Sequence, residues 1–376
     1  MNLYFDNAAT SRPKPACVGD AMARALIACG NPGRGGHVYA MNAARVMWEA
    51  REAAASLFGV SNPENVIFTL NCTQSINMVL AGALYPGDHV VVSDVEHNAV
   101  MRPLTEWRIP YTAVRTVAGD TAATVAAFEA AIRPTTRLIF CTHASNVTGE
   151  ILPIAALGEL AHRRGLALAV DGAQSGGILP LHMVRDHVDF LCLPGHKGLY
   201  GPSGTGLLLS SQKLPLAPLF VGGTGSHSLQ MTQPESWPER MESGTPNVVG
   251  VAGLGAALRW LSPRRESVAA HEFAQGKRLW ERLSAVRGVR VHTACPSPET
   301  TVPLVLFSVD GESSEQTAER LGQCGVAVRA GLHCAPTGHR KLGTLPDGGV
   351  RVAPGAFTAA EDVDRLVALV ACRRSV

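Results

Sequence analysis

Short apolar runs alternate with amphipathic stretches along the first part of the chain. Apolar runs bounded by turn residues are typical of buried strands, whereas apolar positions spaced three and four apart indicate a helix that buries one face. This pattern predicts strands over 66–69, 88–93, 137–142, 166–170, 188–193 and 206–209, and helices over 43–58, 73–83 and 154–164. The strand–helix–strand unit over 137–170 is predicted to be right-handed, with its two strands parallel.

The last part of the chain has a different pattern. Amphipathic helices are predicted over 265–286 and 314–324, and strands over 302–309 and 326–329. The spacing of Thr358 and Glu361 is that of a capping box, which predicts the start of a last helix. These passages suit a smaller α/β domain. We therefore predict three parts: an N-terminal segment over 1–14 that packs with the small domain, a large domain over 15–255 and a small domain over 256–376.

Composition narrows the classes of function. The chain has 376 residues, of which 46% are hydrophobic and 17% charged, with a formal net charge of +2 and no long basic run. Such a balance does not indicate nucleic acid or an anionic membrane as the main partner. No apolar run reaches the ~18 residues of a membrane span, and no signal-peptide pattern is present, so a cytoplasmic enzyme is expected. The nine cysteines include no C-x-x-C pair, which argues against a metal site.

Two polar residues stand where buried strands end. Lys197 lies in a glycine-rich stretch between the strands 188–193 and 206–209, and Asp171 directly follows the strand 166–170. A desolvated lysine is a nucleophile that can form a Schiff base with an aldehyde cofactor. An aspartate at a strand's carboxyl end could pair with the ring nitrogen of pyridoxal 5'-phosphate (PLP). Alone, each has a plainer interpretation, a hairpin lysine and a turn or cap aspartate; together they are more specific.

Other polar residues follow the same predicted strands. Thr73 opens a helix after a strand, which suits a phosphate site as well as an ordinary helix cap. His97 follows the strand 88–93, where it could stack on a flat cofactor and carry protons. Asn146 and Gln174 follow two neighbouring strands and could bind a substrate carboxylate or a ring oxygen, although turn positions favour both residue types. The strands converge on one sheet edge, which favours a shared site.

Several motifs together resemble the class V, fold-type I PLP enzymes, and within them the group II cysteine desulfurases and selenocysteine lyases. They are Phe5–Thr10, His196–Lys197, the Arg-x-Gly-x-His-Cys-Ala pattern over 329–335, and Gly349–Val352. The resemblance covers nearly the whole chain. It implies an α/β fold with a large domain around a central, mostly parallel seven-stranded sheet and a smaller C-terminal α/β domain. It also implies a homodimer with shared active sites, which would bring the Gly30–Gly36 loop near a site; a surface loop is the alternative.

The resemblance also implies roles for single residues. Lys197, Cys334 and His97 are the implied catalytic residues, and Asn146 and Arg351 would bind the substrate. The implied cofactor-binding residues are Cys72, Thr73, His97, Asn146, Asp171, Ala173, Gln174, His196, Lys197 and Thr245, of which Thr245 would serve the other subunit's cofactor. Pro194 departs from the family's usual serine or threonine, so one phosphate contact is lost. Arg329, His333, His339, Arg340 and Lys341 are expected to surround Cys334 with positive charge, which favours a reactive thiol.

The predicted activity is therefore a cysteine desulfurase that converts L-cysteine to L-alanine, with a persulfide formed on Cys334 for a sulfur-acceptor protein. A selenocysteine lyase, an aminotransferase and a C–S lyase are alternatives with the same fold and the same cofactor. A non-catalytic scaffold and a cysteine-dependent hydrolase are alternatives from other classes. The hydrolase would leave Lys197 and Asp171 unexplained, and a protein that takes up no PLP would favour the scaffold.

Overall fold

A large sheet forms the centre of the computed structural model, which describes residues 2–33, 35–226 and 228–372. Within these residues the sheet has seven strands in the order β2 (Val66–Thr69), β8 (Gly206–Ser210), β7 (Phe190–Pro194), β6 (Ala167–Asp171), β5 (Thr136–Thr142), β3 (His89–Ser93) and β4 (Tyr111–Val114). The pairs from β7 to β4 are parallel, whereas β8 is antiparallel to both β7 and β2. The prediction of a mostly parallel seven-stranded sheet is confirmed.

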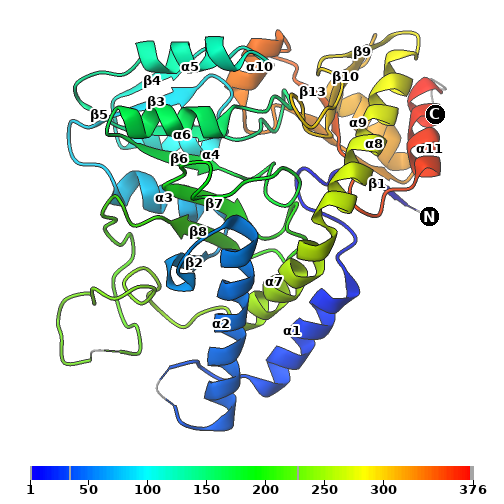
Figure 1. Ribbon diagram of the computed structural model, residues 1–376. Helices are drawn as coiled ribbons and strands as arrows, with labels where there is room; N and C mark the ends of the chain where they lie inside the picture. Colours follow the sequence, from blue (N-terminus) through cyan, green and yellow to red (C-terminus); the bar gives the residue numbers. More distant parts are fainter. Residues whose placement is uncertain (1, 34, 227, 373–376) are drawn as a thin grey trace.

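Helices cover both faces of this sheet (Figure 1). Successive strand residues point to opposite faces, so Val91, Ile139 and Leu168 enter one hydrophobic core and Val90, Leu138 and Ala169 enter the other. The first core is completed by α2 (Val38–Phe58), α5 (Thr121–Ala130), α6 (Ile154–Arg163) and α7 (Val248–Leu261), and by α1 (Ala16–Ala28) beside α7. The second core is completed by α3 (Cys72–Gly82) and α4 (Asn98–Glu106).

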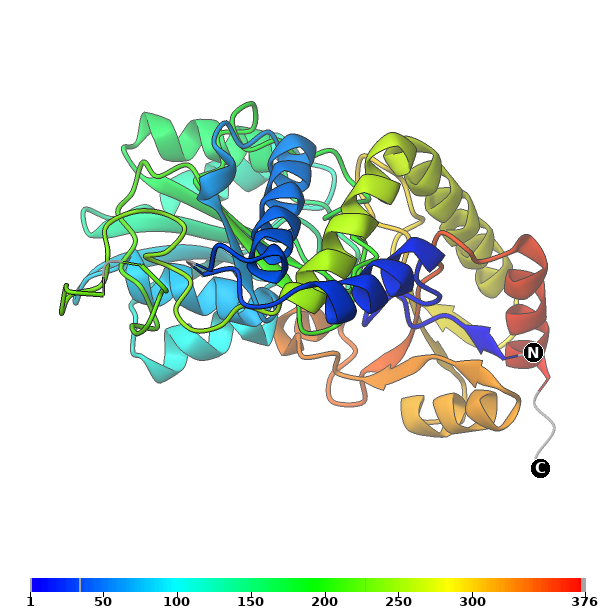
Figure 2. The same ribbon diagram turned by 90° about the horizontal axis from the view of Figure 1, so that it is seen from below.

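A smaller antiparallel sheet is built from the last part of the chain. Its order is β12 (Arg329–Gly331), β13 (Gly349–Val352), β10 (Val305–Val309) and β9 (Val289–Val291), and it packs with α8 (Arg265–Ser284), α9 (Ser314–Gln323) and α11 (Ala360–Ala371). The N-terminal strand β1 (Leu3–Tyr4) pairs in parallel with β11 (Val326–Ala327), beside this sheet (Figure 2). Leu3 and Phe5 are buried in the same core, so the two ends of the chain fold together.

Two sequence predictions about this region are wrong. The strand expected over 326–329 is divided, because β11 pairs with β1 and β12 pairs with β13. The last helix begins at Ala360, and Asp362 Oδ2 accepts a hydrogen bond from Ala359 N at 3.2 Å. Thr358 is therefore not the N-cap; its hydroxyl accepts from the Gly355 N–H instead. The domain boundaries themselves stay predictions.

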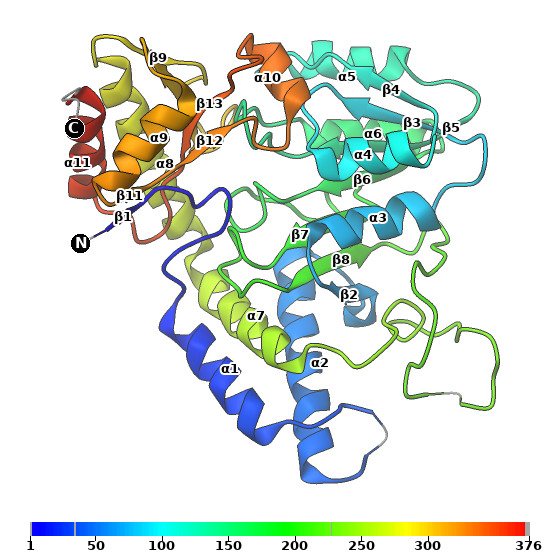
Figure 3. The ribbon, with the colours of Figure 1, turned by 180° about the vertical axis from the view of Figure 1, so that it is seen from behind.

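The smaller sheet lies to one side of the large sheet, and α7 and α8 connect the two parts (Figure 3). A 3-10 turn over Ser262–Arg264 separates these helices. The carboxyl ends of β5, β6 and β7 face the region where the segments of the smaller sheet approach. None of the helices in the described part of the chain is both long enough and apolar enough to span a bilayer.

Candidate active site

The carboxyl ends of the parallel strands surround a cavity of about 520 Å³, part of which is open to solvent. Asp171 ends β6, Pro194 ends β7, and His97 follows β3. Most of the predicted site residues line this one cavity, namely Cys72, Thr73, His97, Asn146, Asp171, Ala173, Gln174, His196 and Lys197. The strand topology therefore brings together residues that are far apart in the sequence.

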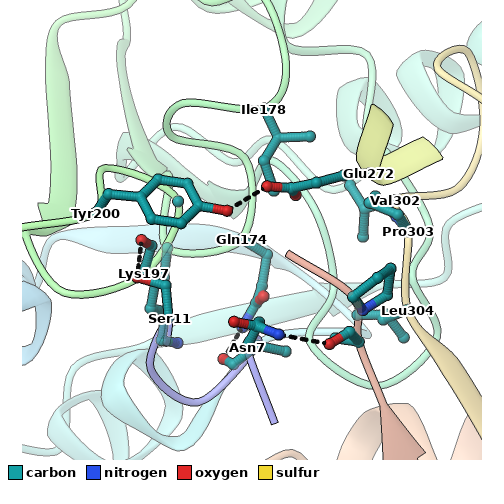
Figure 4. Close-up of a pocket in the computed structure, with 15 residues that line it drawn as sticks. Asn7, Ser11, Gln174, Ile178, Lys197, Tyr200, Glu272, Val302, Pro303 and Leu304 are labelled. Carbon is teal, nitrogen blue, oxygen red and sulfur yellow. Dashed lines mark hydrogen bonds between the residues drawn. The ribbon is translucent and has the colours of Figure 1, made fainter. Parts of the chain in front are cut away.

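Lys197 lies in the loop that follows β7, and it is partly buried, with its side chain lining the cavity. Its carbonyl oxygen accepts hydrogen bonds from the Ser11 hydroxyl at 2.9 Å and from the Tyr200 N–H at 2.8 Å, which fix the backbone (Figure 4). Burial lowers the pKa of Lys197, and the nearby Arg351 guanidinium lowers it further. Both effects favour the neutral amine, which is the nucleophilic form.

Asp171 presents one carboxylate oxygen to the cavity. Its Oδ1 accepts hydrogen bonds from the Ala173 N–H at 2.9 Å and from the Cys72 thiol at 3.4 Å. Burial raises the pKa of Cys72, so this thiol keeps its proton and can act as the donor. Oδ2 makes no hydrogen bond to any described residue and faces the cavity, so the carboxylate is held in place with one acceptor to spare.

Two histidines of the cavity are neutral at neutral pH. His97 caps α4, and its Nδ1 accepts from the Ala99 N–H at 2.9 Å. Burial lowers the pKa of His97, so its proton is on Nε2. Burial also lowers the pKa of His196 to about 4. The Nδ1 atom of His196 is buried without a hydrogen-bond partner among the described residues, which marks a place for a polar group of a ligand.

The amides of Asn146 and Gln174 are engaged with the protein. Asn146 Nδ2 donates to the His333 carbonyl at 2.7 Å, and Gln174 Nε2 donates to the Ala8 carbonyl at 3.0 Å. Each side chain still lines the cavity. Their predicted contacts with a substrate or a cofactor ring stay predictions.

Arg351 on β13 is only 3% exposed, so it is not a surface arginine. It donates to the Asn146 carbonyl at 3.0 Å and lies 3.5 Å from Asp6 Oδ1. Burial lowers the pKa of Arg351 to about 10, which still leaves it charged at neutral pH. Asp6 also binds Arg329 at 3.0 Å. The sequence did not indicate that the N-terminal segment would orient both arginines.

Cys334 lies in the loop between β12 and α10 (Pro336–Leu342), and its side chain is exposed. Its carbonyl accepts from the Asn98 N–H at 2.7 Å, next to His97. Cys334, His97 and Thr73 line an open groove that adjoins the Lys197 cavity, since His97 and Thr73 border both spaces. Cys334, the thiol that the sequence predicts to be reactive, therefore lies beside the opening of the Lys197 cavity.

The expected positive surroundings of Cys334 are only partly correct. Burial lowers the pKa of His333 to about 3 and that of His339 to about 4, so both rings are neutral. Lys341 is paired with Asp94 and with Glu150, the latter at 2.7 Å. The sequence shows which residues are close along the chain but not which of them are buried or paired.

Residues 3–366 match the family model described as aminotransferase class-V. The chain belongs to this family. It is 36% identical over 96% of its length to a probable cysteine desulfurase of Pseudomonas aeruginosa, covering 91% of that protein, and 31% identical over 97% of its length to the cysteine desulfurase CsdA of Escherichia coli, covering 92%. It is also similar to the apo structure of a cysteine desulfurase from Thermococcus onnurineus, with a TM-score of 0.88, 28% identity and coverage of 98% and 94% of the two chains.

In this member of the aminotransferase class-V family, sequence reasoning missed two buried acids. Glu96 is fully buried beside His97 and accepts from the Thr142 N–H at 2.9 Å, and burial raises its pKa to about 8. Glu272 lines a second cavity behind Lys197, where Tyr200 donates to it at 2.5 Å (Figure 4). Glu272 belongs to α8 and Tyr200 to the lysine loop. Only the position of Glu96 directly before His97 could have drawn attention to it.

Thr245 is the predicted cofactor residue that does not line the Lys197 cavity. It is exposed, and with Asn31, Gly33 and Arg51 it borders another cavity. The Gly30–Gly36 loop, of which Arg34 lies outside the described residues, borders the same space. Within one chain, therefore, Thr245 is not part of the lysine site.

Proposed function

We propose that this protein is a PLP-dependent cysteine desulfurase, which converts L-cysteine to L-alanine and keeps the sulfur as a persulfide on Cys334. The observation that carries the proposal is the exposed Cys334 thiol in a groove that shares His97 and Thr73 with the Lys197–Asp171 cavity. The similarity to proteins named cysteine desulfurase supports the same activity. The persulfide would then pass to an acceptor protein.

The residues of the cavity fit PLP. His196 Nδ1 and Asp171 Oδ2 have no hydrogen-bond partner among the described residues and could each bind a polar group of the cofactor. Lys197 offers an amine whose pKa is lowered. Lys197 would hold the aldehyde carbon, Asp171 the ring nitrogen, and Thr73 and His196 the phosphate. When bound, PLP supplies an electron sink for the substrate's α-carbon.

The chain's own groups account for the remaining steps. Arg351 is charged and would bind the substrate α-carboxylate, and the Lys197 amine would take the α-proton. The Cys334 thiol gives up its proton and the thiolate attacks the substrate sulfur: an S–S bond forms, the C–S bond breaks, and the released carbon takes up a proton. His97 is the proposed carrier that receives the thiol proton and passes it to the carbon. The balance is L-cysteine plus the Cys334 thiol giving L-alanine plus the Cys334 persulfide.

We further propose a homodimer in which each site uses Thr245 of the other subunit. Large apolar side chains are exposed on segments that border the cavity lined by Thr245 or lie next to such segments in the sequence: Ile27 is 82% exposed near the end of α1, and Met41 is 61% exposed in α2, one turn before the lining residue Ala44. In the segment between β8 and α7, Leu229 is 99% exposed and Met231 is 100% exposed. Apolar surface of this extent is typical of a protein interface.

The test is to replace Cys334 with serine and to assay alanine from L-cysteine in the PLP-loaded protein. The Cys334→Ser variant should still bind L-cysteine and shift the cofactor absorbance, because these steps need no protein thiol. Alanine release should fall by roughly 100-fold or more, since a serine hydroxyl is a poor sulfur acceptor. Cys324→Ser, at an exposed cysteine that ends α9, is the control and should keep normal activity. Alanine release at the wild-type rate in Cys334→Ser would instead favour a general C–S lyase or an aminotransferase.

A further inference from the structure

The backbone around Cys334 has an unusual conformation. His333 has a φ of 50° and Cys334 a φ of 55°, so two successive residues with side chains are left-handed. This region is unfavourable for residues other than glycine, and it persists only where the surroundings impose it. The contacts that hold this turn therefore also set the direction of the Cys334 thiol.

A buried pair of histidines lies directly behind the turn. The rings of His333 and His339 are stacked, with centroids 5.4 Å apart and an angle of 15° between their planes. His333 Nδ1 lies 3.2 Å from His339 Nε2, and His339 Nδ1 lies 2.7 Å from the Thr344 hydroxyl. The other end of the pair, His333 Nε2, lies 3.2 Å from the Arg329 carbonyl oxygen. These contacts form one continuous row from Thr344 to Arg329.

The direction of these hydrogen bonds follows from their last acceptor. The Arg329 carbonyl can only accept, so His333 Nε2 must carry a hydrogen. In a neutral His333 the Nδ1 atom then accepts from His339 Nε2–H, and His339 Nδ1 accepts from the Thr344 hydroxyl. With both histidines neutral, every ring nitrogen has a partner, and the hydrogen bonds run in one direction from the Thr344 hydroxyl to the Arg329 carbonyl.

The turn is fixed from the opposite side as well. The His333 carbonyl accepts from Asn146 Nδ2 at 2.7 Å, and the Cys334 carbonyl accepts from the Asn98 N–H at 2.7 Å. Asn98 is the first residue of α4, directly after His97. The histidine pair holds the turn on one side, and these two donors hold it on the other. Removal of the hydrogen bonds of the histidine pair should therefore weaken the hydrogen bonds from Asn146 and Asn98.

We propose that His339 is a positioning residue for the desulfurase reaction: through His333 and with Thr344, it holds the Cys334 thiol in the direction of attack. This inference rests on the proposed function of Cys334. It requires no movement of the loop, because the thiol is already exposed at the groove. A misplacement of about 1 Å in a reacting group can lower a rate by about 100-fold.

The experiment compares three variants with a matched control. His339→Phe keeps a flat ring against His333 but removes both ring hydrogen bonds. Thr344→Val removes only the contacts of the Thr344 hydroxyl, with His339 Nδ1 and with the His339 carbonyl at 3.3 Å, and Thr344→Ser keeps a hydroxyl there. His89→Phe is the control: His89 is a buried histidine that also binds two threonine hydroxyls, at 2.8 and 2.9 Å, but at the amino-terminal end of β3. Hydrogen–deuterium exchange is measured in the cofactor-free protein, and kcat and KM for L-cysteine in the PLP-loaded protein.

His339→Phe should speed exchange at the Asn98 amide by about tenfold or more while core amides of β5 and β6 exchange normally. Its kcat should fall by at least about tenfold with KM unchanged, Thr344→Val should show a smaller fall, and Thr344→Ser should behave as wild type. His89→Phe should change neither the exchange rate of the Asn98 amide nor kcat. Normal Asn98 exchange and normal kcat in both His339→Phe and Thr344→Val would overturn the proposal, whether or not His339→Phe is less stable.

The two proposals fail differently. If Cys334→Ser makes alanine at the wild-type rate, the function proposed for Cys334 is wrong. The exchange at Asn98 would still report whether His339 holds the turn.

Discussion

Burial sets the protonation of the ionisable residues around the cavity. It lowers the pKa of Lys197, which favours the neutral amine, and lowers that of His196 to about 4, so this ring is neutral at neutral pH. It raises the pKa of Glu96 to about 8 and that of Glu272 to about 7, so both acids keep their protons to a higher pH than exposed carboxyl groups do. Arg351, with a pKa lowered to about 10, keeps its positive charge at neutral pH.

Glu272 gives a prediction for stability against pH. Its pKa rises from an ordinary 4.5 to about 7 in the folded protein, so the folded state binds this proton more tightly than the unfolded chain does. The contribution of this proton to the free energy of unfolding is full below pH 4.5, and it is lost as the pH rises to about 7. Glu272→Gln cannot ionise and still accepts from Tyr200, so it should raise the free energy of unfolding at pH 8 by up to about 3 kcal/mol.

Thermal unfolding from pH 5 to pH 8 checks this prediction. The wild type should lose Tm over this range, and Glu272→Gln should lose less. Glu281→Gln, at an exposed position of the same helix α8, should follow the wild type. A Glu272→Gln profile parallel to that of the wild type would show that Glu272 is ionised in the folded protein.

The sequence predicts the site residues that follow the ends of strands. It does not predict the residues whose role depends on their burial in the folded protein. Lys197, Asp171 and His97 could be found because strand ends converge on one edge of a parallel sheet. Glu96 and Glu272 could not, because no pattern near them shows that their carboxyl groups are buried. For the same reason the sequence predicts His333 and His339 as positive neighbours of Cys334, whereas in the structure they form a neutral stack.

In the large sheet, the sequence predicts the strands whose residues are mostly buried, but it misses the buried helix α7 and the buried strand β13 of the smaller sheet. The strand over 66–69 has the predicted bounds, and the other buried strands of the large sheet differ at their ends by one or two residues. The edge strand β4 was missed, because only its last residue is buried and it lacks an apolar run. The short helix α10 was missed as well, since seven residues of mostly polar sequence give no clear period. The division of 326–329 between two sheets depends on the distant partners β1 and β13.

At the scale of the whole molecule, the position of Thr245 is the feature that a single chain does not explain. The cavity that it borders shares no lining residue with the lysine cavity, and the segments that border it also carry exposed apolar side chains, such as Met41 and Met231. A dimer with shared sites accounts for both observations. It also gives the Gly30–Gly36 loop a place beside the partner's site.

Mixed dimers test the shared-site arrangement. A Lys197→Ala chain paired with a Thr245→Ala chain should give one site with both changes and one site with neither. The mixture should therefore regain about half of the wild-type activity per mixed dimer, as complementation across an interface requires. Activity no better than that of either parent homodimer would show that each chain uses its own Thr245.

The central claim is that Cys334 takes the substrate sulfur, and the most direct measurement is the mass of the cysteine peptides after one turnover. PLP-loaded protein would be mixed with L-cysteine without reductant, digested and analysed by mass spectrometry. We predict one additional sulfur atom on the Cys334 peptide, one alanine released for each sulfur bound, and no sulfur on the exposed Cys324. The Lys197→Ala variant should show no added sulfur. Alanine release with an unmodified Cys334 peptide, or with the sulfur on another cysteine, would contradict the account.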